Sequence, residues 1–154
     1  MNETIEQRLM QLGVELPTPA TAVASYVATV RMGSTLITSG QLPLKEGQLM
    51  ARGLLGGEVD VAQGKLAAQC CAINVLAQAK AALGDLERIQ RLVKITVFVA
   101  SAPGFFEQHL VANGASDLFT SALGSKGQHA RSAVGVAGLP MNAAVEVEAT
   151  FEVT

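Results

Sequence analysis

Two short runs near the C-terminus alternate apolar and polar residues, and they constrain the fold more than any other part of the chain. In 131–136 valines alternate with small residues, and in 145–152 apolar side chains alternate with glutamate and threonine. Alternation with a period of two is typical of strands that have one buried face. Gly138, Pro140 and Asn142 supply turn residues between the two runs. The pattern predicts a β-hairpin.

The pairing within this hairpin predicts a charged surface. Matching apolar with apolar residues sets Val134 opposite Val147 in the ladder. Arg131, Glu146 and Glu148 then project from the other face, because successive side chains on a strand point to opposite sides. We therefore expect a cation and two carboxylates to share one surface of the sheet.

The composition predicts one domain, 1–154, that associates with itself. Of the 154 residues, 49% are hydrophobic and only 16% are charged, so a monomer would expose apolar surface. Apolar residues are spread along the chain, without a run long enough to span a bilayer. The first residues are polar and of mixed charge, unlike a secretory signal, which favours the cytoplasm.

The charge of the chain disfavours nucleic acid as a partner, and its cysteines and histidines do not suggest a disulfide or a metal site. A net charge of −2 and a pI of about 5.6 do not suit a nucleic-acid surface, which needs clustered Lys and Arg. Cys70 and Cys71 are adjacent in a helical apolar stretch, and we expect buried free thiols there. His109 and His129 have no third ligand at metal spacing, so no metal is expected.

The rest of the chain predicts an α+β fold. A capping box from Thr4 to Gln7 opens a short N-terminal helix, followed by a connector, within 1–18. The expected order is β-β-β-α-β-α-β-β, with two main helices on one face of the sheet. Before the hairpin we expect strands at 24–31, 35–42, 48–54 and 89–100, a helix from 61 to 83 between Asp60 and Gly84, and a helix at 107–122.

Two separate motifs resemble the YjgF/RidA family. One is the Arg-Ser at 131–132 with the Leu-Pro turn and the Val-Glu-Val-Glu strand after it, and the other is the Thr-Ser-Gly-Gln-Leu-Pro string at 38–43, preceded by Tyr26. The resemblance covers the chain from about residue 19 to the end, and the strings at 113–118 and 127–132 resemble a longer-chain branch. It implies a chorismate-mutase-like fold and a homotrimer with a cleft between each pair of subunits.

The resemblance implies a catalytic pair. Arg131 matches the family arginine that binds a substrate carboxylate, and its planar guanidinium can donate two parallel hydrogen bonds to a small acid. Glu146 matches the residue that holds or activates a water. Structural roles stay open for both: a salt bridge from Arg131 to Glu148 or Glu146, or a solvated strand carboxylate at Glu146.

Five further residues match substrate-lining positions of the family or lie next to one. Tyr26, the only tyrosine, would close the cleft, although its neighbours differ from the family pattern, and Ser39 and Gly40 would supply donors. Packing of a strand tyrosine and a small-residue strand end are the alternatives. Asn113 would orient an amino group or cap a helix. His129 would act as a local acid or base, or be an ordinary loop histidine.

The resulting hypothesis is a cofactor-free deaminase. In the family, reactive 2-aminoacrylate-like enamines and imines are hydrolysed to 2-keto acids and ammonia, mostly through orientation and charge stabilisation. Ala133 stands where the family often has a cysteine, so thiolate chemistry is not expected. The alternative is a non-catalytic trimer that binds a small carboxylate. An endoribonuclease, the third function attached to the family, fits the acidic pI and the 4% aromatic content less well.

Overall fold

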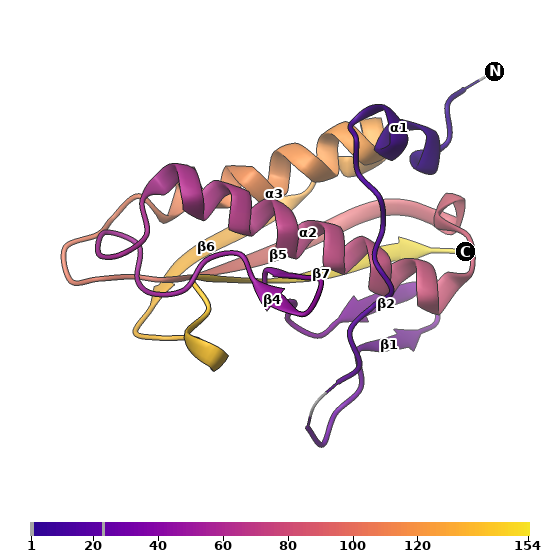
Figure 1. Ribbon diagram of the computed structural model, residues 1–154. Helices are drawn as coiled ribbons and strands as arrows, with labels where there is room; N and C mark the ends of the chain where they lie inside the picture. The colour runs from indigo at the N-terminus through magenta and orange to yellow at the C-terminus, as the bar shows by residue number, and fades with distance from the viewer. Residues whose placement is uncertain (1, 23) are drawn as a thin grey trace.

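The computed structural model describes residues 2–22 and 24–154, in which three helices and a mixed five-stranded sheet form the fold. The helices are α1 (Ile5–Gln11), α2 (Val61–Leu83) and α3 (Gln108–Leu123), and short 3-10 turns cover Leu86–Arg88, Gly124–Gly127 and Pro140–Asn142. The strands are β1 (Thr29–Met32), β2 (Thr35–Thr38), β3 (Leu44–Lys45), β4 (Gln48–Leu49), β5 (Ile89–Ala100), β6 (Ala130–Val136) and β7 (Val145–Val153). Figure 1 shows α2 and α3 side by side over one face of the sheet. The predicted α+β class, with two main helices on one face, is confirmed.

The strand order overturns the predicted hairpin. In the sheet order β1-β2-β7-β5-β6, strand β5 lies between β6 and β7. β6 runs parallel to β5 and β7 runs antiparallel to it. Val134 therefore pairs with Phe98, and Val147 pairs with Val97. The prediction of a β6–β7 hairpin, with Val134 opposite Val147, is wrong.

The character of β5 explains this order. Its predicted bounds, 89–100, match the strand in the structure, and the residues facing the helices are fully buried, among them Ile95, Val97 and Val99. A buried strand must pair its backbone N–H and C=O groups on both edges. A parallel partner needs a crossover connection, and α3 supplies the crossover from β5 to β6.

The same register separates Arg131 from the carboxylates. Arg131 pairs with Ile95, and Ile95 pairs with the buried Ala149, so this row faces the helices. Glu146 pairs with Phe98, three positions along β5 and therefore on the other face. Glu148 lies on that same face, which we call the open face of the sheet. The predicted common surface of Arg131, Glu146 and Glu148 is wrong.

The N-terminal strands are shorter than predicted. The strand expected at 24–31 begins only at Thr29, and the one expected at 35–42 ends at Thr38 before an isolated bridge pairs Gln41 with Val147. The strand expected at 48–54 is not part of the main sheet. The two-residue strands β3 and β4 pair there with each other, because the Lys45–Gly47 turn reverses the chain and Glu46 takes a positive φ of 52°.

α2 is the core helix that the sequence predicted. Asp60 and Gln63 form the expected capping box, and Gly84 ends the helix with a φ of 79°. Cys70 and Cys71 are free and buried as expected, and burial raises the pKa of both thiols. Among the described residues this one helix is long and apolar enough to cross a membrane, but most of its apolar window is buried inside the fold.

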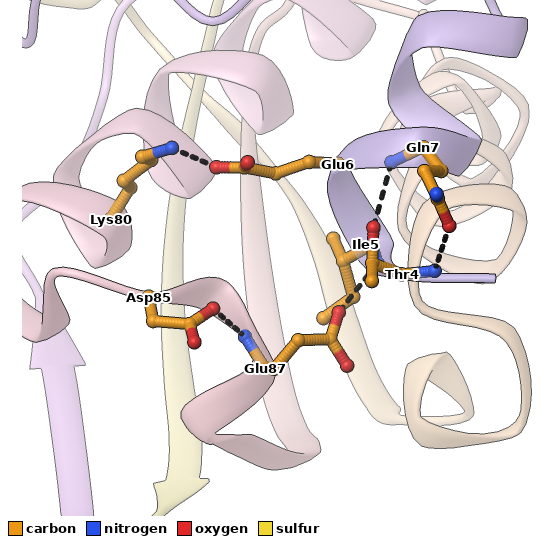
Figure 2. Close-up of polar contacts among 7 residues, drawn as sticks. All are labelled: Thr4, Ile5, Glu6, Gln7, Lys80, Asp85 and Glu87. Atoms are coloured by element: carbon orange, nitrogen blue, oxygen red, sulfur yellow. Dashed lines mark hydrogen bonds and ion pairs between the residues drawn. The ribbon is translucent and has the colours of Figure 1, made fainter. Parts of the chain in front are cut away.

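The N-terminal helix is tied to the rest of the domain by polar contacts (Figure 2). Thr4 and Gln7 form the predicted capping box, and Ile5 is fully buried. The backbone N–H of Ile5 donates to the Glu87 carboxylate at 2.6 Å, and Lys80 on α2 forms an ion pair with Glu6. α1 is therefore docked on the domain instead of standing apart from it.

Apolar side chains are exposed on the open face. Val30 is 54% exposed, Met32 69%, Ile37 39% and Val134 41%. The strand register places all four on the face away from α2 and α3. One chain therefore leaves apolar sheet surface in contact with solvent, which soluble proteins usually cover by association.

Candidate functional site

Arg131 is held against α3 by three hydrogen bonds. It lies on β6, an edge strand, and its side chain extends over the helix-covered side of the sheet. Nη1 donates to Oδ1 of Asn113 at 2.9 Å and to Oγ of Ser116 at 3.2 Å, and Nη2 donates to the carbonyl of His109 at 3.2 Å. The alternative role of Arg131, a salt bridge to Glu146 or Glu148, is not realised in the structure, because those carboxylates lie on the open face.

These contacts leave a defined part of the guanidinium free. A guanidinium carries five N–H donors. Asn113 and Ser116 take both hydrogens of Nη1, and the His109 carbonyl takes one of Nη2. Within the described chain, the Nε–H and the second Nη2–H of Arg131 have no partner. Two donors of this kind suit an incoming carboxylate, since an arginine and a carboxylate pair through two hydrogen bonds.

His129 and Ser116 complete this group. His129 lies two residues before Arg131, and its Nε2 is 2.9 Å from Oγ of Ser116 while its Nδ1 is 2.6 Å from the carbonyl of Gly127. We call Arg131, Asn113, Ser116 and His129 the Arg131 cluster. The structure thus brings together three of the predicted site residues. Ser116 was missed, although its spacing of three residues from Asn113 places both on one side of a helix.

Glu146 is packed against the Ser39–Gly40 segment on the open face. A Cβ atom added to Gly40 would lie 2.7 Å from Cδ of Glu146, so a larger residue there would displace the glutamate side chain. Ser39 does not reach the carboxylate, since its hydroxyl donates to the carbonyl of Val27 at 2.6 Å. Burial raises the pKa of Glu146, and the nearby Glu148 carboxylate raises it further. We call Gly40 and Glu146 the Glu146 corner.

Tyr26 does not lie on a strand. It is in a bend before β1, where its side chain is 52% exposed. The prediction of a tyrosine-containing first strand is wrong, because β1 begins only at Thr29. The exposed ring leaves the segment available for contact with another molecule. Its backbone N–H donates to the carbonyl of Ala24 at 2.8 Å.

One chain keeps the two parts of the predicted site apart. Arg131 and Glu146 are two strands and three rows apart in the sheet, on opposite faces. With strands about 4.8 Å apart and a rise of about 3.3 Å per residue, their Cα atoms are separated by about 14 Å. The Arg131 cluster can bind an anion and the Glu146 corner can exchange a proton, but a single small molecule does not reach both within one chain.

The cavities of the single chain lie elsewhere. A groove of about 700 Å³ runs between the connector after α1, the β3–β4 turn and α2, and cavities of about 460 and 270 Å³ flank α1 and the α2–α3 crossing. Neither Arg131 nor Glu146 lines any of the three. None of these three cavities contains a predicted site residue.

Replacing Glu146 by glutamine should stabilise the chain at neutral pH. Because burial raises the folded-state pKa, folding favours the protonated carboxyl, and its contribution to stability is present in acid and lost as pH rises through the folded-state pKa. Glutamine resembles the protonated form at every pH. The expected gain at pH 7 is at most about 1 kcal/mol, because the carboxyl is partly exposed.

Thermal unfolding at pH 7 and near pH 4 checks this sign. The gain of Glu146→Gln should shrink in acid, and Glu152→Gln, an exposed carboxylate on the same strand, should show no gain. A Glu146→Gln variant less stable than the parent at pH 7 would mean that the carboxylate is stabilised by a partner.

Known proteins resemble this chain along nearly all of its length. A family model described as "YjgF/chorismate mutase-like, putative endoribonuclease" matches residues 6–152. Protein TCP17 from Trypanosoma cruzi is 49% identical over 149 residues, which cover 96% of this chain and 93% of TCP17. The crystal structure of protein Atu1372 from Agrobacterium tumefaciens is 52% identical with a TM-score of 0.92, covering 97% of this chain and 92% of that one. The structure of E. coli TdcF with bound serine is 25% identical with a TM-score of 0.64, covering 99% of this chain and 100% of TdcF.

Proposed function

Since this chain belongs to the YjgF/chorismate mutase-like family, we propose that it hydrolyses reactive enamine and imine acids to 2-keto acids and ammonia without a cofactor. The observation that carries the proposal is the Arg131 guanidinium, held on one edge by α3 with two donors left free. A 2-imino acid has one carboxylate next to its reactive carbon. Binding of that carboxylate by Arg131 orients the C=N bond, so few other protein groups are needed.

The chemistry needs a carboxylate anchor and a proton carrier near a water. Water adds to the imine carbon while its proton passes to the nitrogen, and the resulting amino alcohol releases ammonia as its hydroxyl becomes the carbonyl. Glu146 can accept the proton from water and return it to the leaving nitrogen. Because burial raises its pKa, the Glu146 carboxylate is a stronger base than an ordinary glutamate, which favours this exchange.

We propose that the two parts of the site meet between subunits of a homotrimer. In one chain Arg131 and Glu146 lie on opposite faces, and the open face that carries Glu146 also exposes Val30, Ile37 and Val134. A second copy that covers this apolar surface can bring its own Arg131 cluster to the Glu146 corner of the first. The substrate then binds across the interface.

The assembly is tested by mass in solution. Light scattering should give about three times the chain mass of 15.9 kDa. Val134→Glu, which buries a charge in the proposed interface, should shift the protein toward smaller species, whereas Met10→Glu, which adds the same charge at an exposed apolar residue of α1, should not. A monomeric parent protein would contradict a site shared between subunits.

A small amino or keto acid is the substrate class that the comparisons support. TdcF, at 25% identity, was crystallised with bound serine, whose carboxylate and amino group resemble those of an imino acid. The Arg131 cluster would also serve the alternative function, a non-catalytic trimer that binds a small carboxylate. This alternative is supported by the distance between Arg131 and Glu146 within one chain.

The deaminase activity is tested on imines that are generated enzymatically in the assay. An amino-acid oxidase releases 2-imino acids from amino acids, and the rate of ammonia release is compared with and without the protein. A rate that rises in proportion to the protein concentration supports deaminase activity. Unchanged ammonia release together with saturable pyruvate binding would favour the non-catalytic trimer, and cleavage of RNA would favour an endoribonuclease.

A further inference from the structure

Ser116 and His129 form a hydrogen-bonded chain that ends on Arg131. Oγ of Ser116 lies between Nη1 of Arg131, at 3.2 Å, and Nε2 of His129, at 2.9 Å. Nδ1 of His129 lies 2.6 Å from the carbonyl of Gly127. Both ring nitrogens of His129 are therefore occupied within the protein, and neither is free to exchange a proton with a substrate.

The Gly127 carbonyl assigns the proton on Nδ1 of His129. A carbonyl oxygen only accepts hydrogen bonds, so Nδ1 of His129 carries the hydrogen and donates to Gly127. In the neutral ring Nε2 is then an acceptor, and Ser116 donates its hydroxyl hydrogen to it. This leaves the lone pairs of the Ser116 oxygen for the Arg131 Nη1–H. With a neutral His129 ring, the direction of donation therefore runs from Arg131 to Ser116 to His129.

The His129 end of this series of hydrogen bonds is held in place by packing. The His129 ring packs edge-on against the buried Phe119, with centroids 6.3 Å apart and an interplanar angle of 73°. Gly127, which accepts from His129, is pressed against α3, since a Cβ atom there would lie 2.5 Å from the carbonyl oxygen of Phe119. His129 is therefore fixed by both its ring and its hydrogen bonds, and it fixes the Ser116 hydroxyl in turn.

We infer that Ser116 and His129 are positioning residues that hold the guanidinium of Arg131 by its Nη1 edge, so that the Nε–H and the free Nη2–H face the substrate carboxylate. The inference rests on the proposed function, because it takes Arg131 as the carboxylate anchor. When Ser116 is removed, Asn113 still accepts one Nη1–H and the His109 carbonyl still accepts one Nη2–H, so the guanidinium stays near its place but is held less firmly in its orientation. The expected effect is weaker binding with little change in the chemical step.

The test compares Ser116→Ala, His129→Leu and the double variant with the parent in the imine assay. The KM should rise about tenfold in each single variant, with kcat within about twofold. The double variant should be no worse than the poorer single one, because both act through one contact. His129→Gln, whose amide oxygen can accept from Ser116, should recover most of the loss, and Ser121→Ala, an exposed serine on the same helix, should leave KM unchanged.

Pyruvate binding by calorimetry separates this inference from the proposed reaction. Weaker binding in Ser116→Ala supports the positioning role even if the parent protein releases no ammonia. An active parent whose KM and pyruvate affinity are unchanged in both single variants would overturn the positioning role alone, as would fully additive losses in the double variant. A parent that binds no pyruvate and hydrolyses no imine would overturn both.

Discussion

Arg131→Ala should lower kcat/KM for imine hydrolysis by about 30- to 1,000-fold, which corresponds to about 2–4 kcal/mol of transition-state binding. The free Nε–H and Nη2–H are the donors that the proposal assigns to the substrate carboxylate. Their loss removes the contact that orients the reacting carbon. Ammonia release from oxidase-generated imines measures the effect.

Arg131→Lys separates orientation from charge. A lysine keeps the positive charge but replaces the planar fork with one ammonium, so it should recover little of the activity. Arg91→Ala, an exposed arginine on β5, is the matched control and should retain parent activity. An Arg131→Ala variant that is folded, assembled and fully active would return Arg131 to a structural role, as the residue that ties β6 to α3.

Local patterns predicted the elements that depend on a few neighbouring residues. The capping box at Asp60 and the glycine at 84 set the ends of α2, and the β-branched run at 89–100 set those of β5. Each of these signals depends on hydrogen bonds or steric contacts between residues that are close together in the sequence. The 48–54 strand failed because a tight turn at Lys45–Gly47 closed a hairpin of its own.

The pairing of distant strands was not predictable from alternation. The runs at β6 and β7 have matching periods, but the period is equally satisfied by pairing each of them with β5, which is the pairing in the structure. The position of Arg131 follows from the pairing of β6 with β5. Its row contains Ile95 and Ala149 instead of Glu146 and Glu148, so its partners come from α3.

Three of the predicted site residues lie together in the structure, in an arrangement that the sequence did not predict. Of the residues that the resemblance singled out, Arg131 binds Asn113 directly and is linked to His129 through Ser116. For Ser116 the sequence offered only its helical spacing from Asn113, because a helical serine is common and its role depends on β6 lying beneath α3. The contact between Gly40 and Glu146 also depends on the register of β2 and β7.

Gly114→Ala should destabilise the fold by about 3 kcal/mol, the upper part of the range for an overpacked core. The residue lies on α3 where it crosses α2, and an added Cβ atom would be 2.0 Å from the carbonyl oxygen of Lys65 and 2.7 Å from its carbonyl carbon. Backbone atoms cannot turn aside as a flexible side chain does, so the two helices must separate. A loss of this size lowers the melting temperature by about 6–12 °C for a domain of this length.

The sign of this effect is the opposite of what helix propensity alone predicts. In an exposed helix interior, replacing glycine by alanine gains about 1 kcal/mol. Gly138→Ala is the control, because no atom lies within 4 Å of its added Cβ and its backbone needs no glycine. Gly114→Ala should therefore melt well below the parent while Gly138→Ala does not, and a stabilised Gly114→Ala would mean that the helices do not cross at this distance.

Gly114 also links packing to the site. It lies between Asn113 and Ser116, the two α3 residues that hold Nη1 of Arg131. A helix pushed away from α2 carries both acceptors with it, and a displacement of a few tenths of an ångström is a large fraction of the tolerance of a 2.9 Å hydrogen bond. At a temperature where Gly114→Ala is still folded, its KM in the imine assay should therefore rise in the direction expected for Ser116→Ala. An unchanged KM in a destabilised Gly114→Ala would show that the Arg131 cluster follows β6 and not α3.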